Sequence, residues 1–276
     1  MTPAVTDAEL QASAPVILLG RGGSGTRLLS DLALLNGVFL GSALNASQDS
    51  VEWLEVLYPL ALEATAAGVA AGSDRDAFWR ARTRQQAAGI LGSAGLRAAS
   101  LWGWKLPETM LALPQVLRSF PCARVIHLVR HPVSSALRRT HTTSRMDNPI
   151  GQAVLPAAYR ACGMNPEVIP GDEPYLHNAA SWQFQVGGAL AVLRVMAGEG
   201  RVLQLHYEDV CADPACAQQR VAGFLGLPAP GRTVAARIDL ARTNPVMVSD
   251  GRTDRVWSVC GDTATALGYD RSGAAT

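Results

Sequence analysis

Glycines crowd a short segment between an apolar run and the start of a helical pattern. The segment Val16 to Leu29 reads VILLGRGGSGTRLL, with glycines at positions 20, 22, 23 and 25. Glycine lacks the Cβ atom that keeps backbone N–H groups away from a bound anion, and the first N–H groups of a helix have no partner within it. Arg21 and Arg27 add positive charge at the same place. These residue types and their spacing predict a phosphate-binding loop.

The glycine spacing by itself is compatible with several interpretations. Gly20, Gly22 and Gly25 satisfy the dinucleotide pattern G-x-G-x-x-G, but no acidic residue for the ribose is evident at the end of the next strand. Gly20 and Gly25 also have the spacing of an ATP-binding Walker A loop, but Thr26 occupies the position of its lysine. A third alternative is an ordinary strand-to-helix turn with incidental glycines.

Two further cations follow apolar segments along the chain. Lys105 ends the predicted strand Ser100 to Trp104, and Arg130 ends the predicted strand Arg124 to Val129. A fourth strand is predicted over residues 201–206. Strands that alternate with helices form a parallel sheet, which binds ligands at the carboxyl ends of its strands. The glycine loop, Lys105 and Arg130 are therefore expected at one rim of the sheet.

The composition indicates a local anion site. The chain has 24 basic and 23 acidic side chains, so we expect no binding to nucleic acid or to an anionic membrane. Its five cysteines lack the spacing of a metal site or a disulfide framework, which favours a reducing, cytoplasmic compartment and no metal. The N-terminus has no signal-peptide pattern, and no uncharged run reaches the ~18 residues of a membrane span.

The length of 276 residues suits a single α/β domain. Residues 1–13 are expected to form a loose polar N-terminal arm, and residues 14–276 the domain. The alanine-rich segment 51–92 predicts two helices. The segment 146–174 is rich in proline and glycine and predicts a long irregular loop, of the kind that often covers a binding site.

Several segments together resemble the sulfotransferase family, which uses 3′-phosphoadenosine 5′-phosphosulfate (PAPS). They are GGSGTRLL, GWKLP, VIHLVRHP, and LHYEDVCADP with FLGLP, within residues 16–228, and ALGY near the C-terminus is a weaker echo. The resemblance, to a bacterial type of the family, implies a three-layer α/β fold with a central, mostly parallel sheet, similar to P-loop NTPases. It also implies sulfuryl transfer from PAPS to an acceptor hydroxyl or amine, with adenosine 3′,5′-bisphosphate (PAP) as the product.

The resemblance implies two groups of donor-binding residues. For the 5′-phosphosulfate they are Arg21, Gly22, Gly23, Ser24, Gly25, Thr26 and Arg27, and for the 3′-phosphate Arg130, Ser134, Ser135 and Arg138. The family often has lysine where this chain has Gly23, so Arg21, Arg27 or Lys105 would have to supply that cation. Arg138 replaces a serine that often contacts the 3′-phosphate. Either Ser134 or Ser135 takes over that contact, or the guanidinium of Arg138 makes it.

The general base is expected to be a carboxylate. Family members that use histidine carry K-T-H-L-P after the second strand, whereas this chain has Lys105-Leu106-Pro107 without a histidine. Carboxylate-using members place the base after the first helix, which makes Asp49 the first candidate and Glu52 the second. The structural alternative is that Asp49 caps a helix beginning near Val51. The expected catalytic residues are Asp49, Glu52, Lys105 and Arg27.

Four other residues carry weaker expectations. His141 and His177 are further candidates for the base or for contact with the acceptor. Glu108 is expected to be an ordinary acid in the first turn of a helix, and Glu208 to cap the helix after the fourth strand.

The acceptor stays open among small molecules, lipids, glycans and peptides, as does the oligomeric state. A P-loop nucleotide kinase and a non-catalytic nucleotide-binding module are the alternative functions.

Overall fold

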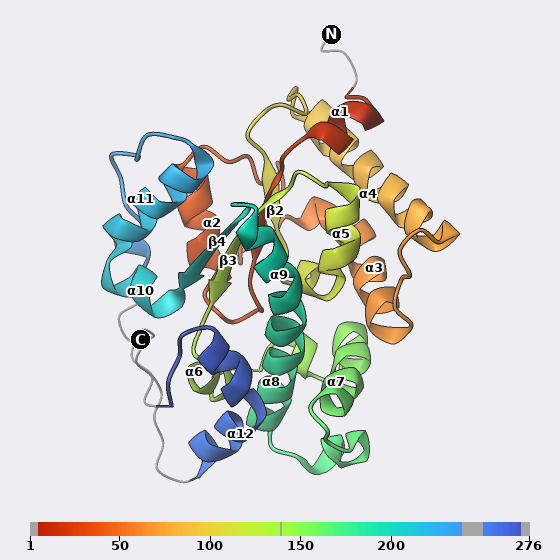
Figure 1. Cartoon of the computed structure of the whole chain (residues 1–276), viewed down its shortest axis with the longest axis vertical. Helices are drawn as coiled ribbons and strands as arrows, with labels where there is room; N and C mark the ends of the chain where they lie inside the picture. Colours follow the sequence, from red (N-terminus) through yellow and green to blue (C-terminus); the bar gives the residue numbers. More distant parts are fainter. Residues whose placement is uncertain (1–4, 139, 239–250, 272–276) are drawn as a thin grey trace.

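A computed structural model describes residues 5–138, 140–238 and 251–271. Four parallel strands form its centre, in the order β2-β1-β3-β4 (Figure 1). They are β1 (Val16–Leu19), β2 (Gly103–Lys105), β3 (Arg124–Val129) and β4 (Val202–His206). The range predicted for β3 is confirmed to the residue, and β1 is the apolar run that precedes the glycine loop. β1 is wholly apolar and β3 is apolar apart from Arg124 and the buried His127, as expected for parallel strands covered on both faces.

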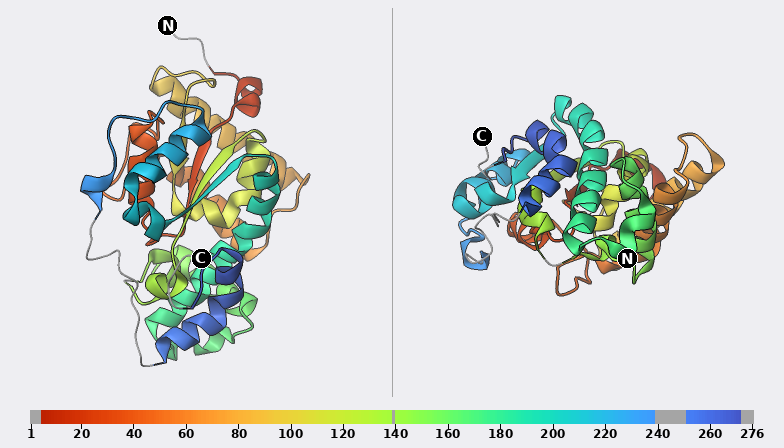
Figure 2. Two further views of the ribbon diagram at one scale, coloured as in Figure 1. Left: turned by 60° about the vertical axis from the view of Figure 1, so that its left-hand side comes forward. Right: turned by 90° about the horizontal axis from the view of Figure 1, so that it is seen from below.

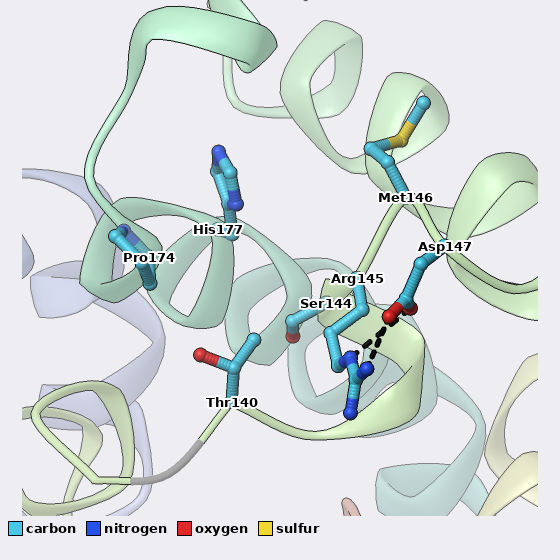
Figure 3. A pocket seen from close by; sticks show the side chains of 7 residues that line it. All are labelled: Thr140, Ser144, Arg145, Met146, Asp147, Pro174 and His177. Atoms are coloured by element: carbon cyan, nitrogen blue, oxygen red, sulfur yellow. Dashed lines mark hydrogen bonds and ion pairs between the residues drawn. The ribbon is translucent and has the colours of Figure 1, made fainter.

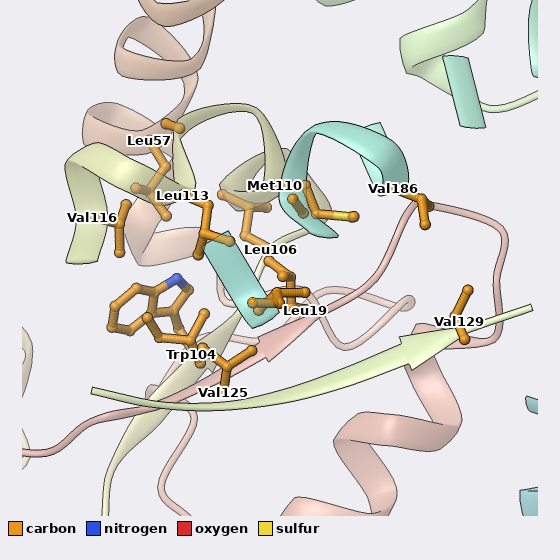
Figure 4. Packing of buried hydrophobic residues seen from close by; sticks show 14 of the residues in the cluster. Leu19, Leu57, Trp104, Leu106, Met110, Leu113, Val116, Val125, Val129 and Val186 are labelled. Atoms are coloured by element: carbon orange, nitrogen blue, oxygen red, sulfur yellow. The ribbon is translucent and has the colours of Figure 1, made fainter. Parts of the chain in front are cut away.

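Helices cover both faces of the sheet, which confirms the three-layer α/β fold (Figure 1). One face packs against α2 (Thr26–Leu35), α10 (Tyr207–Ala212) and α11 (Pro214–Leu225). The other packs against α3 (Leu54–Ala66), α4 (Asp74–Ser93), α5 (Leu113–Ser119), α8 (Pro174–Trp182) and α9 (Gly188–Gly198). Side chains alternate along β3 between the two faces of the sheet. Val125 and Val129 pack in the core on the side of α3, α4, α5, α8 and α9 (Figure 4), and Ile126 packs in the core on the side of α2, α10 and α11.

A group of helices lies beneath the main body of the molecule, in the green and blue lower part of Figure 2. It includes α6 (Pro132–Ala136), which follows β3 directly, together with α7 (Pro149–Ala161), α8 and α12 (Arg252–Ala266). Short helical turns complete the chain. They are η1 (Val51–Trp53), η2 (Pro107–Ala112), η3 (Thr142–Ser144), η4 (Pro166–Gly171), η5 (Gln183–Gly187, a π-helix) and η6 (Ala235–Arg237).

The loose arm predicted over residues 1–13 is wrong for its second half. Residues 7–12 form helix α1 (Asp7–Ala12), which begins at a capping box in which Thr6 and Glu9 each accept from the other's backbone N–H. Leu10 is 1% exposed and belongs to the core beside α4. The polar residues around Leu10 therefore mark the exposed side of a short amphipathic helix.

The irregular loop predicted over 146–174 is also wrong, because most of it is helical. Pro149, Pro166 and Pro174 each occupy the first turn of a helix or helical turn, where the missing N–H has no helical partner to lose. Asn148 and Asn165 cap the first two of these elements with their side chains. The prolines thus mark helix starts. The two helices predicted in 51–92 are observed as α3 and α4.

Candidate active site

The glycine loop joins the carboxyl end of β1 to α2. Gly23 and Gly25 have φ angles of 88° and 94°, in the left-handed region that favours glycine. A Cβ atom on Gly25 would lie 2.3 Å from the ring of Tyr207, so a larger residue does not fit there. Gly25 is the N-cap of α2 and supplies no side-chain cap. The first N–H groups of α2 therefore face the loop without a side-chain acceptor, as an anion-binding site requires.

A cavity of about 530 Å³ opens beside this loop, and we call it the arginine cavity. It is lined by Gly23, Gly25, Thr26, Arg27, Leu28, Asp31, Ser47, Arg130, Arg138, Tyr207, Ala236 and Ile238. Three of these side chains are arginines and one is acidic. The predicted residues Arg27, Arg130 and Arg138 thus come together from α2, the end of β3 and the segment after α6.

Arg130 is held rigidly at the end of β3. Its guanidinium lies 4.1 Å from the ring centroid of Tyr207, and its backbone oxygen accepts a hydrogen bond of 3.1 Å from Trp182 Nε1. Burial, followed by the positive charge of Arg138, lowers the pKa of Arg130. Two cations this close raise the affinity of the cavity for an anion.

Ser134 and Ser135 follow on α6, and both are buried. Neither hydroxyl has a hydrogen-bond partner among the described residues, which is unusual for buried polar groups. Ser135 lines a second cavity, whereas Ser134 lines neither of the two. A bound ligand would satisfy the Ser135 hydroxyl.

The second cavity measures about 660 Å³, and we call it the carboxylate cavity. It is lined by Gly23, Asn45, Ser47, Asp49, Leu54, Tyr58, Leu106, Pro107, Glu108, Ser135, Arg138, Thr140, His141, Thr142 and Arg145. Gly23, Ser47 and Arg138 line both cavities. The two cavities therefore meet beside the glycine loop.

Asp49 is fixed in the carboxylate cavity by two donors. One carboxylate oxygen forms an ion pair with Lys105 Nζ, and the other accepts from Asn45 Nδ2 at 2.9 Å. Lys105 Nζ also donates to the backbone oxygen of Ser47 at 2.7 Å. Burial lowers the pKa of Lys105, an effect that Asp49 opposes. The alternative capping role of Asp49 is not observed, since Ser50 is the N-cap residue of η1 and the turn has no side-chain cap.

Glu108 lies in the first turn of a helical element, as the sequence predicts, but it is buried, unlike an ordinary first-turn acid. It lies in the first turn of η2 and is 3% exposed. Burial raises the pKa of Glu108 to about 7, and the charge of Asp49 acts in the same direction. Tyr58 Oη donates to its carboxylate at 3.4 Å. The available sequence signal was its place three residues after Lys105, at the rim of the sheet.

Six predicted residues line neither of the two cavities: Arg21, Gly22, Ser24, Glu52, Lys105 and Ser134. The carboxylate of Glu52 accepts from the backbone N–H groups of Ser42 at 2.9 Å and Ala43 at 3.3 Å, so it holds the loop before Asp49. Arg21 is 1% exposed and points into the protein, where it contacts Ser144 and Asn178.

The two candidate histidines line different cavities, His141 the carboxylate cavity and His177 a third one. The ring of His141 covers Gly22, at which a Cβ atom would come within 1.9 Å of His141 Nε2. His177 lines a third cavity of about 530 Å³ with Thr140, Ser144, Arg145, Met146, Asp147 and Pro174 (Figure 3). This third cavity shares Thr140 and Arg145 with the carboxylate cavity. An elongated molecule could thus extend from one into the other.

Within the described ranges, no group of three or more His, Cys, Asp or Glu side chains is arranged to hold a metal ion. The helices of these ranges are all too short or too polar to cross a bilayer.

The parallel sheet, with the glycine loop at its carboxyl rim, defines an α/β protein with an anion-binding loop. Residues 15–231 match the sulfotransferase family, and the chain belongs to this family. The resemblance noted in the sequence is therefore confirmed. Sulfuryl transfer is the activity of this family, so the protein is a transferase of that general kind.

Solved structures extend the comparison to the whole fold. A sulfotransferase from Alicyclobacillus acidocaldarius is similar over 94% of this chain and 97% of its own, at 17% identity and a TM-score of 0.55. A sulfotransferase from Mycobacterium avium is similar over 95% of this chain and 79% of its own, at 15% identity and a TM-score of 0.53. These likenesses concern the fold. A comparison with curated proteins finds no match.

Proposed function

We propose that this protein is a PAPS-dependent sulfotransferase that acts on a hydroxyl or amine of its acceptor. The observation that carries the proposal is the meeting of two cavities beside the glycine loop. One is lined by three arginines and Asp31, and the other by the carboxylates of Asp49 and Glu108 together with Arg138 and Arg145. They share Gly23, Ser47 and Arg138. Such an arrangement suits an anionic donor on one side and an acceptor that must lose a proton on the other.

The residues of the arginine cavity fit the two ends of PAPS. The backbone of Gly23 to Thr26, with the N-terminus of α2, is suited to the 5′-phosphosulfate. Arg130 and Arg138 are suited to the 3′-phosphate. The unpartnered hydroxyl of Ser135, which lines the adjoining carboxylate cavity beside Arg138, is a further candidate donor. Arg27 is an exposed cation that lines this cavity and adds positive charge beside the glycine loop.

Asp49 is the proposed general base. The acceptor oxygen or nitrogen forms a bond to sulfur as the bond between sulfur and the 5′-phosphate oxygen breaks, and the acceptor proton passes to Asp49. Lys105 and Asn45 hold the Asp49 carboxylate in the cavity wall. Arg27 and the N-terminus of α2 stabilise the negative charge that develops on the leaving 5′-phosphate. In-line positioning of the two substrates supplies most of the remaining rate enhancement.

The acceptor is proposed to bind in the carboxylate cavity. Leu54 and Tyr58 of α3 and Leu106 and Pro107 supply its apolar wall. Small molecules, lipids, glycans and peptides are all candidates, and the third cavity offers room for an extended one. We propose a cytoplasmic location, consistent with the scattered, unpaired cysteines of the described residues.

Thermal-shift titration tests the donor assignment. Because a ligand stabilises the state that binds it, PAP should raise the melting temperature far more than equal concentrations of ATP or NAD. Equal responses to all three ligands would overturn the proposal. Incubation with PAPS and a panel of acceptors, read by mass spectrometry as the gain of one SO₃ group, then identifies the acceptor class. Selective PAP binding without turnover on any acceptor would favour the non-catalytic alternative.

A further inference from the structure

Arg21 is a buried cation whose hydrogen-bond partners are all neutral. Nη2 donates to Ser144 Oγ at 2.6 Å and to Asn178 Oδ1 at 2.9 Å, and Nη1 donates to the Gly22 backbone oxygen at 3.2 Å. Within residues 5–138, 140–238 and 251–271, no carboxylate forms an ion pair with it. Burial lowers the pKa of Arg21 to about 10, which leaves the guanidinium charged at neutral pH.

Two other buried charged side chains, Lys105 and Asp76, have counter-ions. Lys105 is paired with Asp49, and the buried Asp76 is paired with Arg118 at 2.7 Å and Arg80 at 3.3 Å. Near Arg21 lies the Cys260 thiol, but burial raises the pKa of Cys260 well above its ordinary value and keeps it neutral. A buried charge without a counter-ion is strongly destabilising, and neutral acceptors offset only part of that effect.

The charge of Arg21 lies directly behind the glycine loop. Nη1 is 4.0 Å from the position that a Cβ atom on Gly23 would occupy, and Gly23 lines both cavities. Arg21 itself lines neither of the two. Its field therefore reaches the loop surface through protein, where screening by water is weak. This is also the place where a side chain on residue 23 would begin.

We propose that the anionic 5′ end of the bound donor is the counter-charge of Arg21, which acts from behind the Gly22–Gly23 backbone as a positioning residue. The inference rests on the proposed function and specifies what replaces the lysine absent at Gly23. Through Ser144 and Asn178 the same guanidinium also anchors the segment that carries His141 and Arg145. The donor loop and one wall of the carboxylate cavity are thereby joined by one side chain.

Two nucleotides separate this role from a merely structural one. PAP carries both phosphates, whereas adenosine 3′-monophosphate lacks the 5′-phosphate that Arg21 is proposed to balance. In R21M, the Kd for PAP measured by calorimetry should rise roughly tenfold or more, whereas the Kd for adenosine 3′-monophosphate should change by less than about twofold. A structural defect would weaken the binding of both nucleotides alike, and that result would overturn the inference. An unchanged Kd for PAP would overturn it as well.

Further variants keep the test decisive if R21M folds poorly. R21K retains the charge and should bind PAP within about threefold of the wild type, whereas R21Q, neutral but hydrogen-bonding, should reproduce the selective loss. Arg124 is a matched control, because it is a partly buried arginine far from the glycine loop. It lies at the start of β3, at the amino end of the strand, and donates to the Phe224 backbone oxygen. R124M should bind both nucleotides normally. Failure of the wild type to bind PAP would overturn the proposed function itself.

Discussion

The arginine cavity and the carboxylate cavity adjoin each other but differ in the charged side chains that line them. Arg130 packs on the ring of Tyr207 and lies close enough to Arg138 for the two charges to interact, so two guanidinium groups line this cavity together. In the carboxylate cavity, Asp49 is paired with Lys105, and Glu108 is buried with a raised pKa. The first cavity is therefore suited to anions, and the second to neutral groups that release a proton. The boundary at Gly23, Ser47 and Arg138 is the expected place of reaction.

The sharpest test of this comparison is D49N, which removes the proposed base. We expect turnover to fall by about 10²- to 10⁴-fold, because the acceptor proton loses its carrier, whereas the Kd for PAP should stay within about twofold. Steady-state kinetics and calorimetry measure the two effects, and PAP binding also reports that the variant is folded. Full activity in D49N would transfer the role of base to Glu108, Glu52 or His141.

Glu108 tests whether the carboxylate cavity holds a neutral acid. Its pKa of about 7 exceeds the ordinary 4.5, so the folded state keeps a proton that the unfolded state has lost between these values. Stability therefore decreases as pH rises through this window and stays reduced above it. E108Q removes the cost of burying the ionised carboxylate. At about pH 8 the free energy of unfolding, measured with urea, should therefore be about 3 kcal/mol higher in E108Q than in the wild type. At about pH 4.5 the two proteins should differ little, and an equal gain at both pH values would contradict this account.

R130A tests the arginine cavity. Loss of one charge-assisted contact to a phosphate corresponds to a rise of roughly ten- to a hundredfold in the Kd for PAP. The Kd for adenosine 5′-monophosphate, which lacks the 3′-phosphate, should change much less. Calorimetry with both nucleotides measures the difference. An unchanged Kd for PAP would exclude contact between Arg130 and the 3′-phosphate.

The smallest effect is expected from E52Q. Glu52 accepts from two backbone N–H groups, and the amide oxygen of glutamine can still do so. Turnover should change by less than about twofold, with a loss of stability of about 1 kcal/mol. E52Q is a matched control for D49N, because both substitutions neutralise a carboxylate in the same loop region. The same kinetic assay measures both variants. A large loss of turnover in E52Q would make Glu52 the better candidate for the base.

Local patterns in the sequence predicted the sheet and the glycine loop well. β1 and most of β3 are apolar, and α2 begins directly after the glycines. These features depend on neighbouring residues, whose spacing a sequence displays directly. The segment 146–174 shows where such reasoning failed. Proline favours both loops and the first turns of helices, and the capping residues Asn148 and Asn165 were the overlooked signal.

The charges of the candidate site depended on contacts between distant residues. The sequence alone determined that Arg21 and Arg27 flank the glycines, but packing against Ser144 and Asn178 decided that Arg21 points inward while Arg27 stays exposed. Tertiary structure likewise brought Asp49 to Lys105 and buried Glu108. Burial and the proximity of other charges control what an ionisable group can do, and both arise from residues far away in the chain. The sequence thus determined the position of the anion loop, and only the fold decided which charges surround it.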